Sequence, residues 1–420
     1  MPRIRFHVEA VAFLAALFLS GVALASDPVV PASPVVVPDT GNNRVLIYYA
    51  PTASNAAADV VLGQSSSTSG SSGTSSTTMN APEAYTFDSS GNLYISDSGN
   101  CRVLVFPQPF STGEEATMVI GQPDANTGCG GAASASTLGT TGGVAFGTHG
   151  NFWVADTSNN RILKFLAPFT TGMNAKLVLG QTDFTSTGCA APPTAASLCS
   201  PQGITFDSGG ILWVADTSNN RVLAYRLTLS LSAKKEFGHP AATAFTSNTI
   251  NDGGVSATSL YGPTGIGIDS SQNVWVADTQ NNRVLIFKPA VNKNGTPASF
   301  VLGQSDFTGL TANIGASGLN TPWGIITQAG ATPWVGDSSN SRTLQFTPPI
   351  SSGMNASLVL GQPDFDSNLP NQGSSSQSSQ SQDSPFGPGF VYAGPSLIAL
   401  AVLVVLAVGF EWIRRRRQRA

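Results

Sequence analysis

Residues 213–225 read WVADTSNNRVLAY, and variants of this stretch recur along the whole chain. Five mostly apolar residues end at Asp216, a polar turn follows, and five further residues begin with Arg221. Short apolar segments rich in Val and Trp and bounded by Asn and Asp predict strands. Asn and Asp favour the turn between them, because their side chains bond to nearby backbone and Asn tolerates a left-handed conformation. The stretch therefore predicts two short strands joined by a tight turn.

An aspartate and an arginine five residues apart mark six copies of this turn. The pairs are Asp39 and Arg44, Asp97 and Arg102, Asp156 and Arg161, Asp216 and Arg221, Asp278 and Arg283, and Asp337 and Arg342. Successive arginines are 58, 59, 60, 62 and 59 residues apart. A nearly constant period of this length indicates a repeat architecture with one supersecondary unit per repeat.

Each repeat contains four strand-like segments. In the third repeat GVAFG begins at Gly143, FWVAD at Phe152, RILKF at Arg161 and LVLGQ at Leu177. Four antiparallel strands repeated six times predict an all-β fold, a six-bladed β-propeller of four-stranded antiparallel blades. In the fourth repeat the fourth segment has diverged to KEFGH, from Lys235. The first repeat lacks a clear first strand; Val29 and Val30 are the candidate for it, and how the ring closes stays open.

The pattern P-x-G-I-x-x-D-x-x-G-N-L-W-V-A-D-T-x-N-N-R-V-L resembles the NHL repeat. It matches best at 201–225 and 263–287, and the resemblance extends over roughly residues 34–365. The chain is similar to exported NHL-repeat proteins of the bacterial type, and the resemblance implies the propeller fold. Some six-bladed relatives of the NHL repeat are enzymes, including zinc-dependent amidating lyases and streptogramin lyases, and propellers that resemble gluconolactonases use carboxylates around a central metal.

Both ends of the sequence predict membrane targeting. Residues 1–25 have the basic start, apolar run and small-residue cleavage site of a signal peptide. The propeller is expected over 26–366 and a flexible Ser/Gln-rich stalk over 367–389. An apolar stretch at 390–413 predicts a transmembrane helix, and the arginines of 414–420 predict a cytoplasmic tail. The chain is therefore expected to be exported and anchored by a single span, with the propeller outside the cytoplasm.

The charge balance argues against nucleic acid as a partner. Lysine and arginine number 20 in the whole chain, against 24 aspartates and glutamates. Seven of the basic residues lie at the two ends, and six more are the arginines of the repeated turn. No basic patch is left over to neutralise phosphates, the interaction that dominates nucleic-acid binding.

The six Asp–Arg pairs favour a structural role over a ligand-binding one. A group present in every unit usually stabilises the unit, and arginine can bind the Asp carboxylate and neighbouring carbonyls together. The aromatic residues three positions before each Asp are expected to pack one blade against the next. They are Tyr94, Trp153, Trp213, Trp275 and Trp334.

The segments between repeats vary most in sequence and are the expected binding loops, because variable loops on a rigid scaffold usually carry function. They comprise residues 65–80, 123–141, 182–200, 240–262 and 305–320. If strands alternate in direction, these loops and the Asp–Arg turns lie on one face of the propeller. A protein, peptide or glycan partner is expected there.

All four cysteines fall on that face. An even number of cysteines in an exported protein favours disulfides over metal ligation. Three pairings are possible, and sequence proximity favours Cys101 with Cys129 and Cys189 with Cys199. Four free buried thiols are the alternative.

No catalytic motif is present, and the function predicted from the sequence is that of a binding scaffold. The alternatives are a structural envelope component and a carboxylate-metal-dependent lyase or hydrolase. For the enzyme, weak metal-ligand candidates are Asp88, Asp207 and Asp269, which end first strands. No cofactor is predicted, and a structural or channel divalent cation such as calcium stays open.

Overall fold

The computed structural model describes residues 34–288, 293–327 and 332–371. The predicted signal peptide, membrane helix and cytoplasmic tail, most of the stalk, and the candidate strand at Val29 and Val30 lie outside the described residues. No helix within the described ranges is long and apolar enough to cross a membrane. The chain divides into two units, Met1–Ser33 and Pro34–Ala420, and the second contains all the elements below.

The strands form six antiparallel sheets, one for each repeat. Blade 1 comprises β1 (Val35–Asp39), β2 (Arg44–Tyr48) and β3 (Val60–Leu62). Blade 2 comprises β4 (Pro82–Phe87), β5 (Leu93–Asp97), β6 (Arg102–Phe106) and β7 (Met118–Ile120). Blade 3 comprises β8 (Thr141–Phe146), β9 (Phe152–Asp156), β10 (Arg161–Phe165) and β11 (Leu177–Leu179). Blade 4 comprises β12 (Pro201–Phe206), β13 (Leu212–Asp216), β14 (Arg221–Tyr225) and β15 (Lys235–Phe237). Blade 5 comprises β16 (Pro263–Ile268), β17 (Val274–Asp278), β18 (Arg283–Phe287) and β19 (Phe300–Leu302). Blade 6 comprises β20 (Pro322–Ile326), β21 (Trp334–Asp337), β22 (Arg342–Gln345) and β23 (Leu358–Leu360). Five sheets have four strands, and the described part of blade 1 has three.

The divergent KEFGH segment still forms the outermost strand of its blade, because strand pairing uses backbone groups that every residue supplies. Lys235 pairs with Ala224 and Phe237 with Val222. The prediction of four strands per repeat is therefore confirmed for blades 2 to 6.

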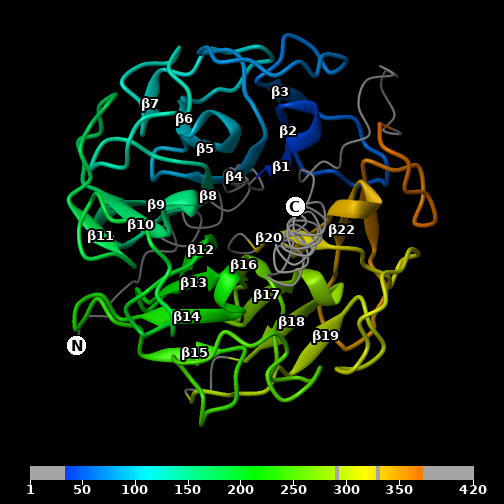
Figure 1. The fold of residues 1–420 in the computed structure, drawn as a ribbon. Coiled ribbons are helices and arrows are strands. Elements are labelled where there is room, and N and C mark those ends of the chain that lie inside the picture. The colour runs from blue at the N-terminus through cyan, green and yellow to red at the C-terminus, as the bar shows by residue number, and fades with distance from the viewer. Residues whose placement is uncertain (1–33, 289–292, 328–331, 372–420) are drawn as a thin grey trace, which may run out of the picture. The chain divides into compact units, whose positions relative to one another are not determined.

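The six sheets follow one another around a common centre (Figure 1). The innermost strands β4, β8, β12, β16 and β20 contact one another in that order. Middle strands such as β5, β9 and β13 are buried along their whole length, because each sheet packs against a neighbour on both faces.

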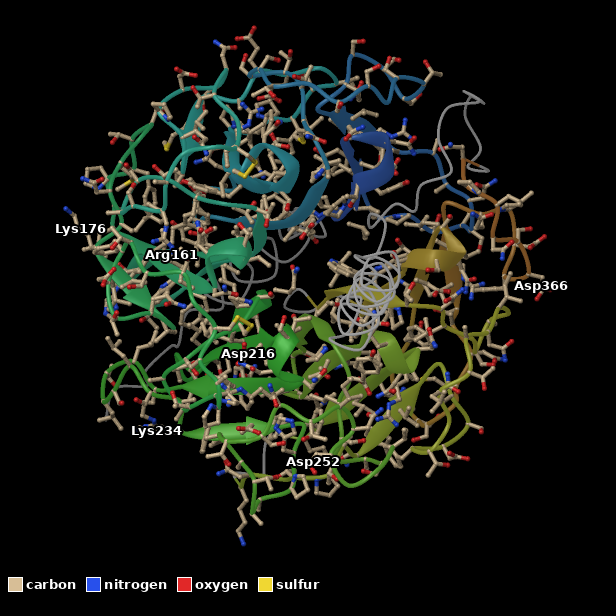
Figure 2. All side chains as sticks on the ribbon, viewed as in Figure 1. Arg161, Lys176, Asp216, Lys234, Asp252 and Asp366 are labelled. Carbon is tan, nitrogen blue, oxygen red and sulfur yellow. A yellow bond between two sulfur atoms is a disulfide. The ribbon has the colours of Figure 1, made fainter. Side chains whose placement is uncertain are left out.

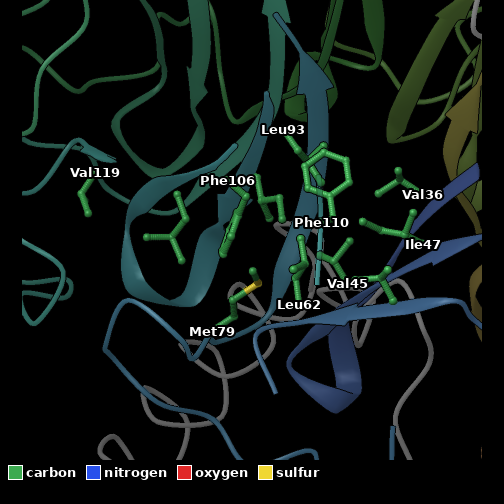
Figure 3. Close-up of a cluster of buried hydrophobic side chains, with 12 residues drawn as sticks. Val36, Val45, Ile47, Leu62, Met79, Leu93, Phe106, Phe110 and Val119 are labelled. Carbon is green, nitrogen blue, oxygen red and sulfur yellow. The ribbon is translucent and has the colours of Figure 1, made fainter. Parts of the chain in front are cut away.

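Six clusters of buried apolar side chains hold the blades together, one at each interface. Figure 3 shows the first, in which Val36 and Ile47 of blade 1 meet Leu93 and Phe106 of blade 2. The predicted aromatic positions each pack into the following blade, as Trp153 does against the core of blade 4. Trp334 of blade 6 joins the cluster of blade 1, so apolar packing closes the ring.

Candidate binding face

The repeated turn is a short 3₁₀ segment that ends in a left-handed residue. In blade 4 the segment Thr217–Asn219 is followed by Asn220 at φ 53° and ψ 39°. The same conformation recurs in every blade, with Cys101 and Ser341 replacing the asparagine in blades 2 and 6. This geometry brings the Asp before the turn and the Arg after it directly opposite each other in the sheet, as for Asp216 and Arg221.

Every Asp–Arg pair forms an ion pair between Arg Nε and Asp Oδ2, at 2.6 to 2.7 Å. Both side chains are fully buried in blades 2 to 6, whereas Arg44 of blade 1 is 14% exposed. In blades 2 to 6, Asp Oδ1 accepts the backbone N–H that lies two residues before the blade's first strand, as from Cys199 to Asp216 at 2.7 Å. The pair therefore joins the turn to the start of the innermost strand.

The arginines of blades 2 to 6 also bind the backbone of the segments before and after their own blade. Arg102 Nη2 donates to the carbonyls of Ser75 and Thr78, at 2.8 and 3.0 Å, in the loop before the blade. Arg102 Nη1 donates to the carbonyl of Ala125 in the loop after it. Arg161, Arg221, Arg283 and Arg342 repeat this arrangement. A guanidinium buried beneath two loops fixes the backbone of both.

The left-handed asparagine anchors the same loops from its own side chain. Asn160 Nδ2 donates to the carbonyl of Thr187, at 2.6 Å, and its Oδ1 accepts from the backbone of Ser200, at 2.6 Å. Asn43, Asn220 and Asn282 make equivalent pairs of bonds.

Sequence reasoning missed one further anchor, the glutamine of the repeated Gly-Gln pair. Gln64 Nε2 donates to the carbonyls of Asn43 and Ser71, at 3.0 and 2.9 Å. Gln181, Gln304 and Gln362 make the corresponding two bonds. The recurrence of Gly-Gln after the fourth strand marks this position in the sequence, but it does not identify the carbonyls that the side chain binds.

Blade 4 replaces the glutamine with His239, and the surrounding contacts change with it. His239 Nδ1 lies 2.6 Å from Glu236 Oε1, and both side chains are fully buried. Glu236 Oε2 accepts from the backbone N–H of Phe245 and lies 3.6 Å from Arg221 Nη1. The buried carboxylate of this divergent strand is thus compensated by an arginine, a histidine and an amide.

Both predicted disulfides are present. Cys101 is bonded to Cys129 and Cys189 to Cys199, each with Cα atoms 5.0 Å apart. Both bonds lie on the face of the Asp–Arg turns, where they fix residues of the inter-blade loops. The prediction of these two pairings is confirmed.

Burial and hydrogen bonding shift carboxyl pKa values in opposite directions across this face. Burial raises the pKa of Asp97, Asp156, Asp216, Asp278 and Asp337, although the paired arginines lower it. Burial also raises the pKa of Glu83, on the innermost strand β4, to about 7. On the exposed loops, bonds from hydroxyls and backbone amides lower the pKa of Asp124, Asp183, Asp306 and Asp364.

The three weak metal-ligand candidates lie at the opposite ends of their strands, away from the Asp–Arg turns. Asp207 Oδ1 accepts from the backbone of Gly209 and Ile211, and its Oδ2 accepts from Trp213 Nε1 at 3.1 Å. Asp88 and Asp269 close their own turns in the same way. No group of three or more His, Cys, Asp or Glu side chains among the described residues is placed to hold a metal ion.

Comparison with known proteins identifies the repeat. Residues 142–165, 198–225 and 260–287 match the family model of the NHL repeat. No curated protein matches the chain.

Several solved structures are similar over most of their length. A streptogramin B lyase is 14% identical, with a TM-score of 0.40 over 76% of this chain and 80% of its own. A catalytically inactive virginiamycin B lyase from Staphylococcus aureus with quinupristin is 15% identical, with a TM-score of 0.39 over 76% and 81%. A protein of unknown function from Bacteroides caccae is 9% identical, with a TM-score of 0.44 over 79% and 93%.

Three repeats match the NHL model, and the same turn recurs in six consecutive sheets. The chain is therefore an NHL-repeat β-propeller.

Proposed function

We propose that this protein is an extracytoplasmic binding scaffold, whose inter-blade loops engage a protein, peptide or glycan and whose C-terminal apolar stretch anchors it to a membrane. The observation that carries the proposal is the anchoring of the loops. In blades 2 to 6, buried arginines bind loop carbonyls on both sides of the blade, so that loops of different sequence are presented in fixed positions. A surface fixed before binding loses little conformational freedom when the partner arrives.

The charge distribution favours a partner that carries basic groups. The inter-blade loops contain no lysine, arginine or glutamate, and their charged residues are the aspartates Asp124, Asp183, Asp252 and Asp306. The segment that follows blade 6 adds Asp364 and Asp366. The loops of the opposite face carry the exposed basic residues Lys176, Arg226, Lys234, Lys288 and Lys293. Figure 2 labels members of both sets, Asp252 and Asp366 of the first and Lys176 and Lys234 of the second. Complementary charge at such a face accelerates association and selects among partners.

Exposed aliphatic side chains on three adjacent loops give the same face an apolar component. Ile250, Leu310 and Leu369 are 44%, 48% and 63% exposed. Apolar side chains in the centre of an interface contribute most of the binding energy, and charges at the rim contribute mainly to rate and specificity.

The two disulfides support an extracytoplasmic location. Disulfide bonds form and persist in oxidising compartments and are rare in the cytosol. The signal peptide expected at residues 1–25 supports the same location.

The test is capture of a partner from a cell-envelope extract by the full-length protein in detergent. One variant combines Ile250→Ser, Leu310→Ser and Leu369→Ser, and a second carries Asp366→Lys on the loop face. The matched controls on the opposite face are the pair Leu229→Ser and Leu231→Ser, at residues 70% and 45% exposed, and Lys234→Glu. We expect both loop-face variants to lose capture, by about tenfold or more for the triple variant, while the controls retain it. Loss with the control variants alone would reverse the assignment of the binding face.

A further inference from the structure

Basic side chains gather in one sector of the face opposite the Asp–Arg turns. Apart from the arginines of those turns, every lysine and arginine among the described residues belongs to blades 3 to 5. The exposed ones lie in the loops between the third and fourth strands, and they are Lys176, Arg226, Lys234, Lys288 and Lys293. Lys164 and Lys235, on the strands that flank these loops, are half-buried. Figure 2 shows Lys176 and Lys234 at the outer edge of neighbouring blades.

The corresponding loops of blades 1, 2 and 6 have the opposite character. They contain no lysine or arginine, and their charged residues are Asp59, Glu114 and Glu115. The three loops of blades 3 to 5 contain no aspartate or glutamate. Two aspartates of the nearby inner turns, Asp207 and Asp269, have both carboxylate oxygens bonded within their own blades. One sector of this face is therefore positive, and the sector across the ring is negative.

The loop of blade 4 adds exposed apolar side chains to the positive sector. In blades 2 and 3 the corresponding loop directs an aromatic residue inward, since Phe110 and Phe169 pack against core clusters. Residues 226–234 read RLTLSLSAK, and the first leucine, Leu227, packs against the core. Leu229 and Leu231 are instead exposed, and Leu229 is 70% exposed. The fold leaves these two leucines in solvent between Arg226 and Lys234.

A further exposed leucine lies in the neighbouring loop of blade 3. Leu166 directly follows β10 and is exposed. Exposed apolar side chains that cluster and are rimmed by polar residues mark contact surfaces, whereas single ones do not. Leucines of two adjacent loops, bordered by five exposed cations, meet this description.

Backbone contacts hold the loops of blades 4 and 5 next to each other. Asn294 Oδ1 accepts the backbone N–H of Glu236, at 3.0 Å, and the N–H of Gly295 donates to the carbonyl of Glu236, at 3.4 Å. Lys293 therefore lies close to the basic end of the blade 4 loop. The end of that loop is itself fixed, because the N–H of Ala233 donates to the carbonyl of Ala195 at 2.7 Å.

Two of the lysines lie against aromatic rings. Lys164 Nζ is 5.4 Å from the ring centre of Trp153, and Lys288 Nζ is 5.1 Å from that of Phe300. Their aliphatic stems cover apolar surface while the ammonium groups stay toward water. Blades 3 and 5 thus present fixed positive charges on either side of the leucines of blade 4.

We propose that this sector docks on an anionic lipid membrane. The basic–leucine surface consists of residues 166–176, 226–234, 288 and 293–299, with Lys164 and Lys235. Its basic side chains would bind the phosphate and carboxylate groups of anionic lipids, to which clustered lysines and arginines are attracted. Leu229 and Leu231 would enter the boundary between headgroups and acyl chains, where exposed apolar side chains are stabilised.

The combination of charge and leucines favours lipid over other anionic partners. A soluble polyanion such as a sulfated glycan would pair with the lysines but offers no apolar environment to Leu229 and Leu231. A protein partner would need an apolar pocket and an acidic rim matched to the loops of three blades. Lipids satisfy both requirements without such a match, because they are mobile and rearrange around the loops.

Docking through one sector fixes the orientation of the propeller. Asp59, Glu114 and Glu115 are repelled by anionic lipid, so blades 3 to 5 would contact the membrane and blades 1 and 2 would not. The aspartate-bearing loops lie on the other face and would remain open to the partner of the proposed function. The docking itself does not depend on that partner. Partner capture in detergent involves no lipid surface, so the failure of one proposal is distinguishable from the failure of the other.

The experiment uses the full-length protein reconstituted into vesicles, with Leu229→Cys carrying an environment-sensitive fluorophore. We expect a blue shift and a long fluorescence lifetime in vesicles that contain phosphatidylglycerol, and water-like emission in vesicles of phosphatidylcholine alone. Labels at Tyr49→Cys, in the negative sector, and at Leu310→Cys, on the aspartate-bearing face, should stay water-like in both.

Neutral substitutions test the role of charge. Arg226→Gln with Lys234→Gln should lower the ratio of docked to undocked label, read from the two lifetimes, by about thirtyfold, since each basic residue near an anionic surface contributes a factor of about five. Glu114→Gln with Glu115→Gln is the matched control, at two acidic residues of the same face, and should not lower the ratio.

Three results would overturn the proposal. Water-like emission of the Leu229→Cys label in both kinds of vesicle would show that the surface does not meet lipid. An equal blue shift in both kinds, unchanged by the double glutamine variant, would show that anionic lipid is not recognised. Binding of soluble heparin that requires Arg226 and Lys234, without a blue shift in vesicles, would assign the surface to a glycan instead.

Discussion

The disulfide between Cys101 and Cys129 stands where other blades have a hydrogen bond from the left-handed asparagine to the following loop. Cys101 occupies the asparagine position, with φ 56°, and its partner lies 28 residues later. Asn220 and Asn282 reach carbonyls at the same separation, those of Asn248 and Leu310. Blade 2 therefore anchors its loop covalently at a position where the repeat otherwise uses an amide.

This equivalence predicts how the disulfide can be replaced. Changing Cys101→Ser with Cys129→Ser should destabilise the protein by about 2–4 kcal/mol, because the unfolded chain loses a crosslink. Changing Cys101→Asn with Cys129→Thr should recover part of that loss, since asparagine tolerates the left-handed turn and can bind the loop carbonyl. Urea denaturation of the two variants measures the difference. Equal stabilities would show that the asparagine bond does not form in blade 2.

A second prediction concerns the buried arginines. Arg161→Lys keeps the charge but cannot bind Asp156 and the carbonyls of Ser134, Thr137 and Phe184 together, because lysine has one ammonium group in place of the planar fork. The unsatisfied carbonyls and the disturbed buried pair should cost about 3 kcal/mol or more. Lys176→Ala, at an exposed lysine of the same blade, is the control and should change stability little. Thermal unfolding compares the two, and an unchanged melting temperature for Arg161→Lys would contradict the anchoring role.

The third prediction is a dependence of stability on pH. Burial raises the pKa of Glu83 from 4.5 to about 7, against the lowering effect of a hydrogen bond to Ser98. The folded state therefore binds the proton more tightly than the unfolded state. The resulting stabilisation is fully present below about pH 4.5 and is lost as the pH rises through 7.

Glu83→Gln removes this dependence while keeping the shape of the side chain. Relative to the wild type, the variant should gain about 1–3 kcal/mol in unfolding free energy between pH 5 and pH 8. The buried aspartates titrate in both proteins, so the difference between them isolates Glu83. Parallel stability curves over this range would mean that the carboxyl titrates normally.

The fold could be predicted because the same pattern of strand, turn and strand residues occurs six times in the sequence. Val, Ile and Trp recur at the strand positions, and Asn holds the left-handed position in four of the six copies. The place of Cys101 in such a turn indicated its pairing with the nearby Cys129. The role of Gln64 and its counterparts could not be predicted, since the loop carbonyls that they bind are defined only by the path of the folded loop. The contacts of the Glu236 carboxylate with His239 and Arg221 could not be predicted from the sequence either. They form only when the folded blade brings these side chains together.

The last prediction separates a binding scaffold from a carboxylate-metal enzyme. Both carboxylate oxygens accept hydrogen bonds from groups of the same blade in Asp88, Asp207 and Asp269. A cation bound by these oxygens would have to replace those hydrogen bonds. We therefore expect purified protein to contain no stoichiometric divalent ion by mass spectrometry. Millimolar calcium should raise the melting temperature by less than about 1 °C, because a ligand stabilises a protein only in proportion to its binding of the folded state. One ion per chain, released by Asp207→Asn with a fall in melting temperature, would instead favour the lyase or hydrolase alternative.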